Sequence, residues 1–445
     1  MEHASHRPRL AVVYDRGAAS VAEITASLSP VAPLVFVVDP EDAHTEPLLP
    51  LLRDMGEVVS LADGPDRAAA RLRRAGAEGV VTFSERMLPV TAELAGRLGL
   101  EFHDRRTVER LTDKWRQRAC LREAGVDSVR CRRVTALDGL PPALAEVGYP
   151  AIVKPVVSEG SRNTYRIDGG DDVPGLLARL AEADEETGFV VEEYLPGRPG
   201  GEFSDQVSVE SVVQRGRVAH LGVTGKFRLL PPFRERGSFL PAVLSAPETR
   251  RVLDLAGRAV TALGVENGLT HVEIKLTPAG PRLIEVNGRL GGHLGELVLR
   301  ASGQDMIRMA GLVALGEPVR AAFVSPGDVV FHFMNQAPPL PCRLVSVDGA
   351  KELRNTEGVS GYRAFVRPGA SISGGVSTTD LDILFGRASS HDEMLRVLDS
   401  ARARLTFTFD FPAGPAVLDT AALDATLPAG GLIGPPADNG HARRQ

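Results

Sequence analysis

The sequence predicts a protein of mixed α/β class that is built from three successive regions. Short apolar runs alternate with Ala-, Leu- and Arg-rich runs over residues 1–106, an order typical of a parallel sheet covered by helices. Residues 107–320 combine helical runs with antiparallel hairpins, and residues 321–426 are strand-rich with Gly and Pro turns. These patterns predict an N-terminal parallel βαβ domain, a central α+β region and a strand-rich C-terminal subdomain.

Four short buried strands are expected in the first region, because each is a run of apolar, largely β-branched residues. They are LAVVYD, LVFVVD, EVVSL and GVVTF. Helical runs such as PDRAAARLRRAGA and LPVTAELAGRLGL accompany them. No GxGxxG motif follows the first strand, so we do not expect a dinucleotide site there.

The central region begins with an amphipathic run, TVERLTDKWRQRACLREAGV, which predicts a helix that ends at Gly125. YPAIVKPVVSEGSRNTYRI predicts a strand, a loop and a strand, and the helix DVPGLLARLAEA and the strand GFVVEEYLPG follow. DQVSVESVVQRGRVAHLGVTG predicts an antiparallel hairpin that turns at Arg215 and Gly216. After a Pro- and Arg-rich loop come the helix PETRRVLDLAGRAVTALGV, a second hairpin and the helical run LGELVLRASGQDMIRMAGLVALG.

The last region is expected to contain three strands, a helix and a further strand. They are GDVVFHFMN, CRLVSVDG, YRAFVRPG, HDEMLRVLDSARARL and TFTFDF. The tail over residues 427–445 is rich in Gly and Pro, a composition that predicts disorder. A chain of 445 residues exceeds one ordinary hydrophobic core, which agrees with a division into several domains.

Composition excludes some classes of partner. The net charge is -6, and no basic stripe with interleaved aromatic residues is present, so nucleic acid is not expected. The N-terminus lacks the apolar core of a signal peptide, and no apolar run is long enough to span a membrane. The three cysteines form neither a disulfide framework nor a CxxC metal site. We therefore expect a cytoplasmic protein with reduced thiols.

The second hairpin, HVEIKLTPAGPRLIEVNGRLGG, places polar side chains on one face of two strands. Period-two alternation puts Glu285, Asn287 and Arg289 on one face of the second strand and Ile284 on the other. If the turn is centred on its Pro-Ala-Gly segment, Glu273 lies opposite Glu285. Like charges in opposed positions destabilise a sheet, and Mg²⁺ bound by two carboxylates and an amide oxygen would remove the conflict. A solvated sheet face explains this stretch equally well.

Lysine is rare in this sequence, because only five of the 51 basic residues are lysines. They are Lys114, Lys154, Lys226, Lys275 and Lys351. A lysine retained against this bias is a candidate for a site that needs a compact ammonium, for example beside a phosphate. Lys154 ends an apolar strand, and the loop after it contains Ser158, Gly160 and Ser161, small residues whose backbone amides can approach an anion. A surface hairpin is the alternative.

The segment VVEEYLPG ends a strand with an acidic pair and continues into a Pro-Gly turn. Such a strand edge can hold a flat purine through backbone groups, and Glu202 or Asp205 could accept a hydrogen bond from a ribose hydroxyl. In isolation, an ordinary strand end is the simpler explanation.

Taken together and in this order, these segments resemble the ATP-grasp superfamily over roughly residues 107–318. The matching motifs are TDKWRQRACLREAGV, YPAIVKP with its Gly/Ser loop, VVEEYLPG, and HVEIKLTPAGPRLIEVNGRLGG followed by ASGQDM. The last of these, a Glu and a hairpin followed by Glu-x-Asn-x-Arg, is the most specific. The resemblance implies an ATP-grasp fold with two α+β subdomains, including a lid subdomain at about residues 115–192, after the usual N-terminal domain.

The resemblance also implies roles for individual residues. ATP would be bound through its phosphates, adenine and ribose by Lys114, Lys154, Ser158, Gly160, Ser161, Glu192, Glu193, Tyr194, Leu195, Glu202 and Asp205. Glu273, Glu285 and Asn287 would bind Mg²⁺, as two ions and with Mn²⁺ as an alternative. Lys226 would reach the γ-phosphate, and Arg289 would steady the acyl phosphate or the substrate carboxylate.

The implied reaction is the attack of a carboxylate on the γ-phosphorus of ATP, followed by displacement of phosphate from the acyl phosphate by an amine. Within the superfamily the chain resembles the L-amino-acid ligases, which form dipeptides and related amides, often in natural-product pathways. Amino acids are therefore the expected carboxylate and amine substrates. Related enzymes are often homodimers, but nothing in the sequence locates an interface, so the oligomeric state stays open. The substrate pocket would include Arg234, Glu235, Arg236, His293 and Glu296, although a solvated loop explains the first three equally well.

Three other functions stay open at this point. A biotin-carboxylase-like enzyme would phosphorylate bicarbonate, and the absence of an MKM acceptor segment argues only weakly against it. A purine-pathway ligase would need more phosphate-binding cations outside the ATP region. A non-catalytic nucleotide-binding protein is disfavoured because Glu273, Glu285, Asn287 and Arg289 are all retained.

Overall fold

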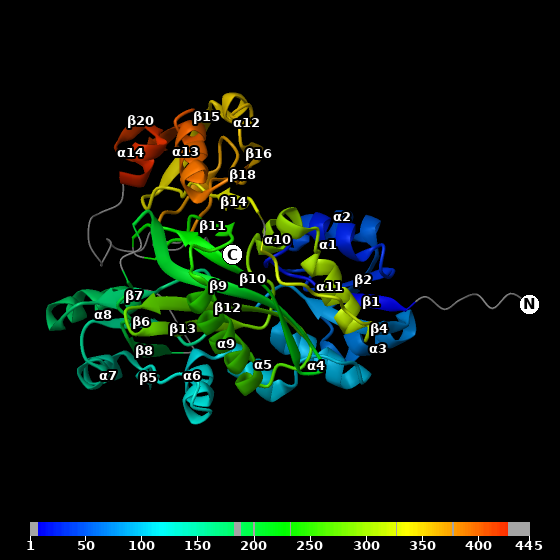
Figure 1. Cartoon of the computed structure of the whole chain (residues 1–445). Coiled ribbons are helices and arrows are strands. Elements are labelled where there is room, and N and C mark those ends of the chain that lie inside the picture. Colours follow the sequence, from blue (N-terminus) through cyan, green and yellow to red (C-terminus); the bar gives the residue numbers. More distant parts are fainter. Residues whose placement is uncertain are drawn as a thin grey trace, which may run out of the picture.

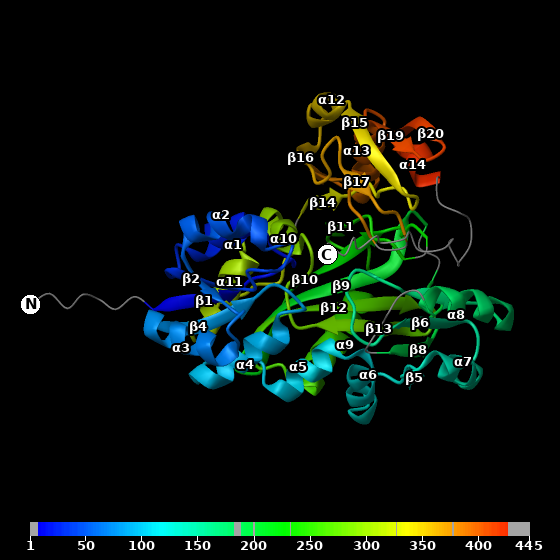
Figure 2. The ribbon, with the colours of Figure 1, turned by 180° about the vertical axis from the view of Figure 1, so that it is seen from behind.

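The computed structural model describes residues 8–181, 188–198, 201–231, 233–325, 327–375 and 378–425. The tail at 427–445, for which disorder is predicted, lies outside the described residues. Figures 1 and 2 show the N-terminal unit on one side of a long central sheet, a small sheet from residues 131–193 below it and the C-terminal strands above. Among the described residues, no helix is long and apolar enough to cross a membrane.

The N-terminal unit is the predicted parallel sheet with helices on both faces, in the order β3-β2-β1-β4. Leu10 and Val12 of β1 pack into one core together with α1, whereas Ala11 and Val13 pack into another with α3 and α4. The strands are β1 (Arg9–Val13), β2 (Leu34–Val38), β3 (Glu57–Ser60) and β4 (Ala77–Thr82). The helices are α1 (Val21–Leu28), η1 (Glu46–Leu48), α2 (Leu49–Met55), α3 (Pro65–Ala75) and α4 (Leu88–Leu98).

A small antiparallel sheet of order β5-β8-β6-β7 lies in the region predicted as the lid subdomain, and it is called the lid sheet below. One apolar core joins this sheet to α7 and α8. The loop between β6 and β7 carries Ser161 and Asn163 at positive φ (56° and 50°). The elements are β5 (Cys131–Val134), η2 (Leu137–Gly139), α7 (Leu140–Val147), β6 (Ala151–Pro155), β7 (Tyr165–Ile167), η3 (Gly170–Asp172), α8 (Val173–Ala181) and β8 (Phe189–Glu193).

The central sheet has eight strands in the order β13-β12-β9-β10-β11-β14-β18-β16. The β9–β10 hairpin pairs Gln214 with Arg217, which confirms the predicted turn. β11 pairs with β14, so the sheet continues past residue 320 into the strand-rich region. The strands are β9 (Phe203–Gln214), β10 (Arg217–Phe227), β11 (Gly237–Leu240), β12 (Gly268–Thr277), β13 (Gly280–Asn287), β14 (Val329–Phe333), β16 (Val359–Ala364) and β18 (Asp382–Ala388). Helix α9 (Ala246–Leu263) packs on one face of this sheet.

The C-terminal unit adds a second antiparallel sheet, of order β17-β15-β19-β20. Its core places Phe407 and Phe409 of β19 against Phe331 of the central sheet and Met394 of α13. The elements are β15 (Cys342–Asp348), α12 (Ala350–Arg354), β17 (Ser371–Ile372), α13 (His391–Arg402), β19 (Thr406–Phe411), β20 (Gly414–Asp419) and α14 (Thr420–Ala425).

The first helical run of the central region is divided, unlike the single helix expected. α5 (Arg105–Thr112) ends and α6 (Lys114–Glu123) begins at Asp113, which has extended backbone angles and whose carboxylate accepts from the backbone N–H of Arg116. A side-chain cap of this kind satisfies a free N–H of the new helix and offers the backbone an alternative to helix continuation. The apolar periodicity on either side does not reveal the break.

The last helical run of the central region is divided for a similar reason. Gly303, at φ 74°, ends α10 (Leu294–Ser302), and Asp305 caps α11 (Met306–Ala314) by accepting from the backbone N–H of Arg308. A glycine at positive φ commonly ends a helix. The break can therefore be predicted from the sequence if Gly303 is taken as the end of one helix and Asp305 as the cap of the next.

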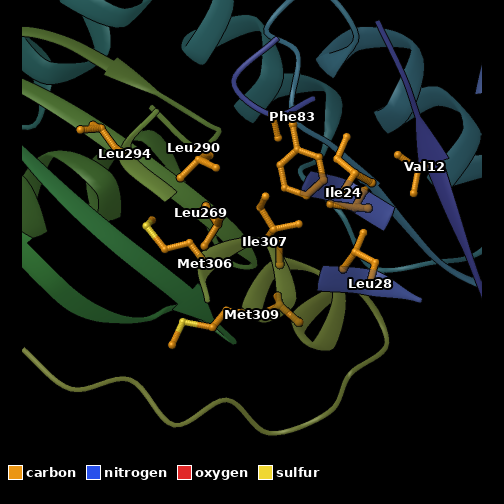
Figure 3. Packing of buried hydrophobic residues seen from close by; sticks show 14 of the residues in the cluster. Val12, Ile24, Leu28, Phe83, Leu269, Leu290, Leu294, Met306, Ile307 and Met309 are labelled. Carbon is orange, nitrogen blue, oxygen red and sulfur yellow. The ribbon is translucent and has the colours of Figure 1, made fainter. Parts of the chain in front are cut away.

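The N-terminal unit is attached to the central sheet by a shared apolar core. Figure 3 shows side chains from β1, α1 and the segment after β4 facing side chains from α11, β12, the start of α10 and the segment before it. The labelled residues are Val12, Ile24, Leu28, Phe83, Leu269, Leu290, Leu294, Met306, Ile307 and Met309. Burial of this apolar surface holds the segment after β4 next to the end of β13.

Candidate active site

The β12–β13 hairpin has the register predicted from the sequence. Glu273 lies opposite Glu285, and His271 lies opposite Asn287. The same face of the sheet therefore brings two carboxylates and an amide together, as period-two alternation requires.

A bulge in β13 corrects the position expected for Ile284. Glu273 pairs with Glu285, but Ile274 pairs with Leu283, so Ile284 is an extra residue in the strand. Ile284 lines the same cavity as Glu285, whereas Leu283 is buried in the core. Bulges re-aim side chains beside functional sites, and a strictly alternating pattern does not reveal them.

A cavity of about 360 Å³ opens between the lid sheet, the central hairpin and the start of the C-terminal unit. Most of the residues predicted for the site line it. They are Lys114, Lys154, Ser158, Gly160, Ser161, Glu192, Glu193, Tyr194, Leu195, Lys226, Glu235, Glu273, Glu285, Asn287, Arg289 and His293. Segments far apart in the sequence therefore converge on one site.

Three predicted residues do not line the cavity. Glu202 is exposed just before β9. Asp205 holds the ammonium of Lys275 at 2.6 Å, and it is Lys275 that lines the cavity. Glu296 is half-buried on α10, and burial raises the pKa of its carboxyl group.

Arg234 and Arg236 do not reach the cavity, contrary to expectation. Arg234 is almost fully buried and donates to the carbonyl oxygen of Ala337 at 2.8 Å. Arg236 pairs with Asp424. Both guanidinium groups bind parts of the C-terminal unit, whose position the local sequence does not reveal. Glu235, between them, points the other way and lines the cavity.

At the lid end of the cavity, Glu192 is held by two buried cations. Arg118 Nε and Nη2 donate to its carboxylate at 2.9 and 3.1 Å, and Lys154 Nζ lies 3.0 Å from Oε2. Burial works to raise the pKa of Glu192, but attraction to Arg118 and Lys154 outweighs it and lowers the pKa to about 2. The carboxylate is therefore ionised at neutral pH.

Sequence reasoning missed Arg118. This residue also donates to the carbonyl oxygens of Leu283 and Ile284, at 2.9 and 2.7 Å, so it ties α6 to the bulge in β13. It lies four residues after Lys114 on α6, a spacing that places both side chains on one helix face. This spacing from Lys114 was the feature of the sequence that could have predicted Arg118 as a site residue.

Two further lysines connect the walls of the cavity. Lys114 Nζ lies 3.0 Å from Glu285 Oε1 and donates to the carbonyl oxygen of Ser158 at 2.7 Å, so it links the hairpin to the lid loop. Lys226 Nζ lies 2.9 Å from Glu235 Oε2. Burial works to lower the pKa of Lys226, but the neighbouring carboxylates raise it.

His271 is charged and sits between two carboxylates. Its Nδ1 lies 2.8 Å from Glu210 Oε1, and its Nε2 lies 3.2 Å from Glu273 Oε1. Burial works to lower the pKa of His271, but attraction to Glu210 and Glu273 raises it to about 9. For Glu273, burial works to raise the pKa, but the bond from His271 lowers it to about 2. His271 was not among the predicted site residues, although it alternates with Glu273 on β12.

Arg289 is fixed by three neighbours, one of them from the N-terminal unit. Its Nη1 donates to the carbonyl oxygen of Leu290 at 3.0 Å, and its Nη2 donates to Asn287 Oδ1 at 3.4 Å. Its Nε lies 3.0 Å from Glu85 Oε2. Burial raises the pKa of Glu85 to about 7, against the attraction of Arg289. No local pattern relates Glu85 to Arg289, so the sequence did not suggest it.

The donor set of the hairpin suits a hard cation that has other oxygen ligands. Glu273, Glu285 and Asn287 offer carboxylate and amide oxygens, which Mg²⁺ prefers. Over the residues that the structure describes, no cluster of three His, Cys, Asp or Glu side chains could hold a metal by itself. The hairpin set therefore fits an ion that takes its remaining ligands from phosphate and water.

Comparison with known proteins places this site in context. Residues 147–296 match the ATP-grasp domain family. Alanine–anticapsin ligase of Bacillus subtilis (strain 168) is 28% identical over 251 residues, 53% of this chain and 53% of that protein. Carnosine synthase 1 of Gallus gallus is 30% identical over 191 residues, 40% of this chain and 20% of that protein. The chain thus spans about half the length of the alanine–anticapsin ligases that it matches.

Solved structures with the same fold cover almost the whole chain. An L-amino acid ligase from Bacillus licheniformis matches with a TM-score of 0.72 and 20% identity, over 90% of this chain and 98% of that one. A 2-oxoglutarate carboxylase biotin carboxylase domain from Hydrogenobacter thermophilus, in complex with MgADP and bicarbonate, matches with a TM-score of 0.67 and 15% identity, over 92% of each chain. These likenesses confirm the predicted fold class.

Proposed function

We propose that this chain, which matches the ATP-grasp domain family over residues 147–296 and resembles the L-amino-acid ligases, is an ATP-dependent carboxylate–amine ligase. It would join amino acids through an acyl phosphate and release ADP and phosphate, in a natural-product pathway. The observation that carries the proposal is the convergence of Lys114, Lys154, Glu285 and Arg289 on one cavity, with Glu273 opposite Glu285.

The lid end of the cavity would bind the nucleotide. Lys114 and Lys154 would neutralise phosphate oxygens, and the segment 192–195 would hold adenine. Lys275, oriented by Asp205, is placed beside Tyr194 and would face the ribose. Glu273 and Glu285 would bind Mg²⁺ together with Asn287, as two ions, and the bound metal would neutralise charge on the transferred phosphoryl group.

Arg289 would bind the reacting carboxylate, because a planar guanidinium can pair with a carboxylate through two bonds. Glu85 and Asn287 fix the guanidinium before the substrate arrives. A carboxylate oxygen would attack the γ-phosphorus while the bond to ADP breaks. The amine would then attack the acyl carbon, phosphate would leave, and the amine would lose a proton.

The direct test is phosphate release with Mg²⁺-ATP against a matrix of paired amino acids, with mass spectrometry of the products. We expect at least one pair to release phosphate and to give an amide of summed mass minus water. ATP turnover without any amide product from any pair would contradict the ligase proposal.

Arg289→Ala should impair amide formation by about 10²-fold while leaving MgADP affinity within a few-fold. The reason is that Arg289 is placed to bind the acyl group rather than the nucleotide. Turnover and calorimetric binding of MgADP would be compared with Arg251→Ala, a change at an exposed arginine on α9. Equal loss of turnover and of MgADP affinity would assign Arg289 a structural role.

A further inference from the structure

Asp380, in the segment before β18, forms part of the cavity wall contributed by the C-terminal unit. Its Oδ1 accepts from Gln336 Nε2 at 2.5 Å, and the two residues also form a β-bridge. The orientation of the Gln336 amide is fixed in turn, because its Oε1 accepts from the backbone N–H of Thr379 at 3.1 Å. The carboxylate of Asp380 is therefore held in place by a neutral amide.

The charge of Asp380 is uncompensated by any direct ion pair. Among the described residues, no Lys, Arg or His pairs with its carboxylate, and its Oδ2 has no hydrogen-bond partner. The neighbouring Glu235, by contrast, is paired with Lys226 at 2.9 Å. Burial raises the pKa of Asp380 to about 6, Glu235 adds to the rise, and Arg16 opposes it from a distance. At neutral pH this carboxylate is ionised and half-buried, a condition that is costly without a cation.

The other residues that line the cavity indicate which kind of cationic ligand would complete the site. Leu229, Phe233 and Met334 line the same cavity and offer apolar surface. His293 also lines it, but burial lowers the pKa of His293, so this ring is neutral and supplies no charge at neutral pH. A ligand for this wall carries one positive group next to a hydrocarbon group.

An α-amino acid with an apolar side chain has this chemistry. We propose that Asp380 is the counter-ion of the α-ammonium group of such a substrate, and that Leu229, Phe233 and Met334 contact its side chain. The inference rests on the proposed ligase function for its catalytic meaning, but it is a statement about binding. It assigns substrate selection in part to the C-terminal unit.

The test is calorimetric titration of the full chain, saturated with MgADP, with L-alanine, L-leucine, L-methionine and L-phenylalanine. Each is paired with its desamino acid and with the amine that lacks its carboxylate. Asp380→Asn keeps the shape and the bond from Gln336 but removes the charge. We expect it to weaken amino acids and amines about tenfold or more and desamino acids less than twofold, as loss of a charged hydrogen bond predicts. Asp328→Asn, at an exposed ion pair with Arg387, is the matched control. It should leave the affinities for amino acids, amines and desamino acids unchanged.

Two arms give the result its meaning. Weakening of the whole amino acids, either together with the amines or alone, supports the proposal, whereas weakening of the amines alone contradicts it, because the proposed ligand is an α-amino acid. Equal weakening of amino acids and desamino acids, no weakening at all, or no binding of any of the four amino acids by the unaltered chain would overturn it. Amino-acid binding that depends on Asp380 without amide product in the ligase assay would refute the proposed function and leave this inference standing.

Discussion

Glu285→Gln is expected to lower ATP turnover by about 10²–10³-fold without unfolding the protein. The substitution keeps the volume of the side chain but removes one of the two opposed charges that would bind Mg²⁺, and it deprives Lys114 of its carboxylate partner at 3.0 Å. Phosphate release would be measured over a Mg²⁺ series, and circular dichroism would report on the fold.

The Mg²⁺ series separates two explanations of a loss in turnover. A metal role raises the Mg²⁺ concentration needed for half-maximal rate, whereas a misplaced Lys114 lowers the rate at every concentration. Glu101→Gln, at an exposed position outside the cavity, is the control and should behave as the unaltered chain. Normal turnover of Glu285→Gln with an unchanged Mg²⁺ dependence would rule out the metal assignment.

Glu192→Gln should have the largest effect on stability, lowering the free energy of unfolding by about 3–5 kcal/mol at pH 7. The substitution leaves Arg118 and Lys154 buried without the carboxylate that both contact. Urea unfolding would measure the change, with Glu146→Gln as the control, because Glu146 pairs with Arg132 at the exposed surface of the lid. If Glu192→Gln lowered the free energy of unfolding no more than Glu146→Gln does, Arg118 and Lys154 would have found other partners.

The same comparison has a definite pH dependence. The pKa of Glu192 is lowered from 4.5 to about 2 in the folded chain, so its contribution to stability is complete above about pH 4.5 and is lost as the pH falls toward 2. The difference in unfolding free energy between the unaltered chain and Glu192→Gln should therefore shrink as the pH is lowered from about 5 to about 3. A difference that stays constant over this range would show that Glu192 is not held ionised by Arg118 and Lys154.

The sequence was most informative where structure is set by neighbours in the chain. Period-two alternation and turn residues were sufficient to predict the β9–β10 turn and the opposition of Glu273 and Glu285, because both depend on local geometry. The scarcity of lysine was also informative. Lys114, Lys154, Lys226 and Lys275 all line the cavity, and Lys351 is exposed on α12. Their roles toward ATP stay predictions.

What the sequence did not reveal depends on contacts between distant segments. Arg234 was assigned to the substrate because it lies in a charged loop, yet it is satisfied by a carbonyl oxygen of the C-terminal unit. Glu85 comes from the N-terminal unit and contacts Arg289, and Asp380 comes from the C-terminal unit and lines the cavity. Neither residue lies in a sequence motif that would have indicated its place. Ile284 was misplaced because one extra residue in a strand reverses the expected face.

The pairing of β11 with β14 has a consequence for how proteins of this architecture could diversify. Recombination near residue 320 would separate partners within one sheet and leave two strand edges exposed, a known route to aggregation. Such a break would also remove the wall that carries Asp380. The C-terminal unit therefore cannot be exchanged as a separate domain without disrupting the central sheet. A new substrate selectivity is more readily acquired by point substitutions around Gln336 and Asp380 than by exchange of the whole unit.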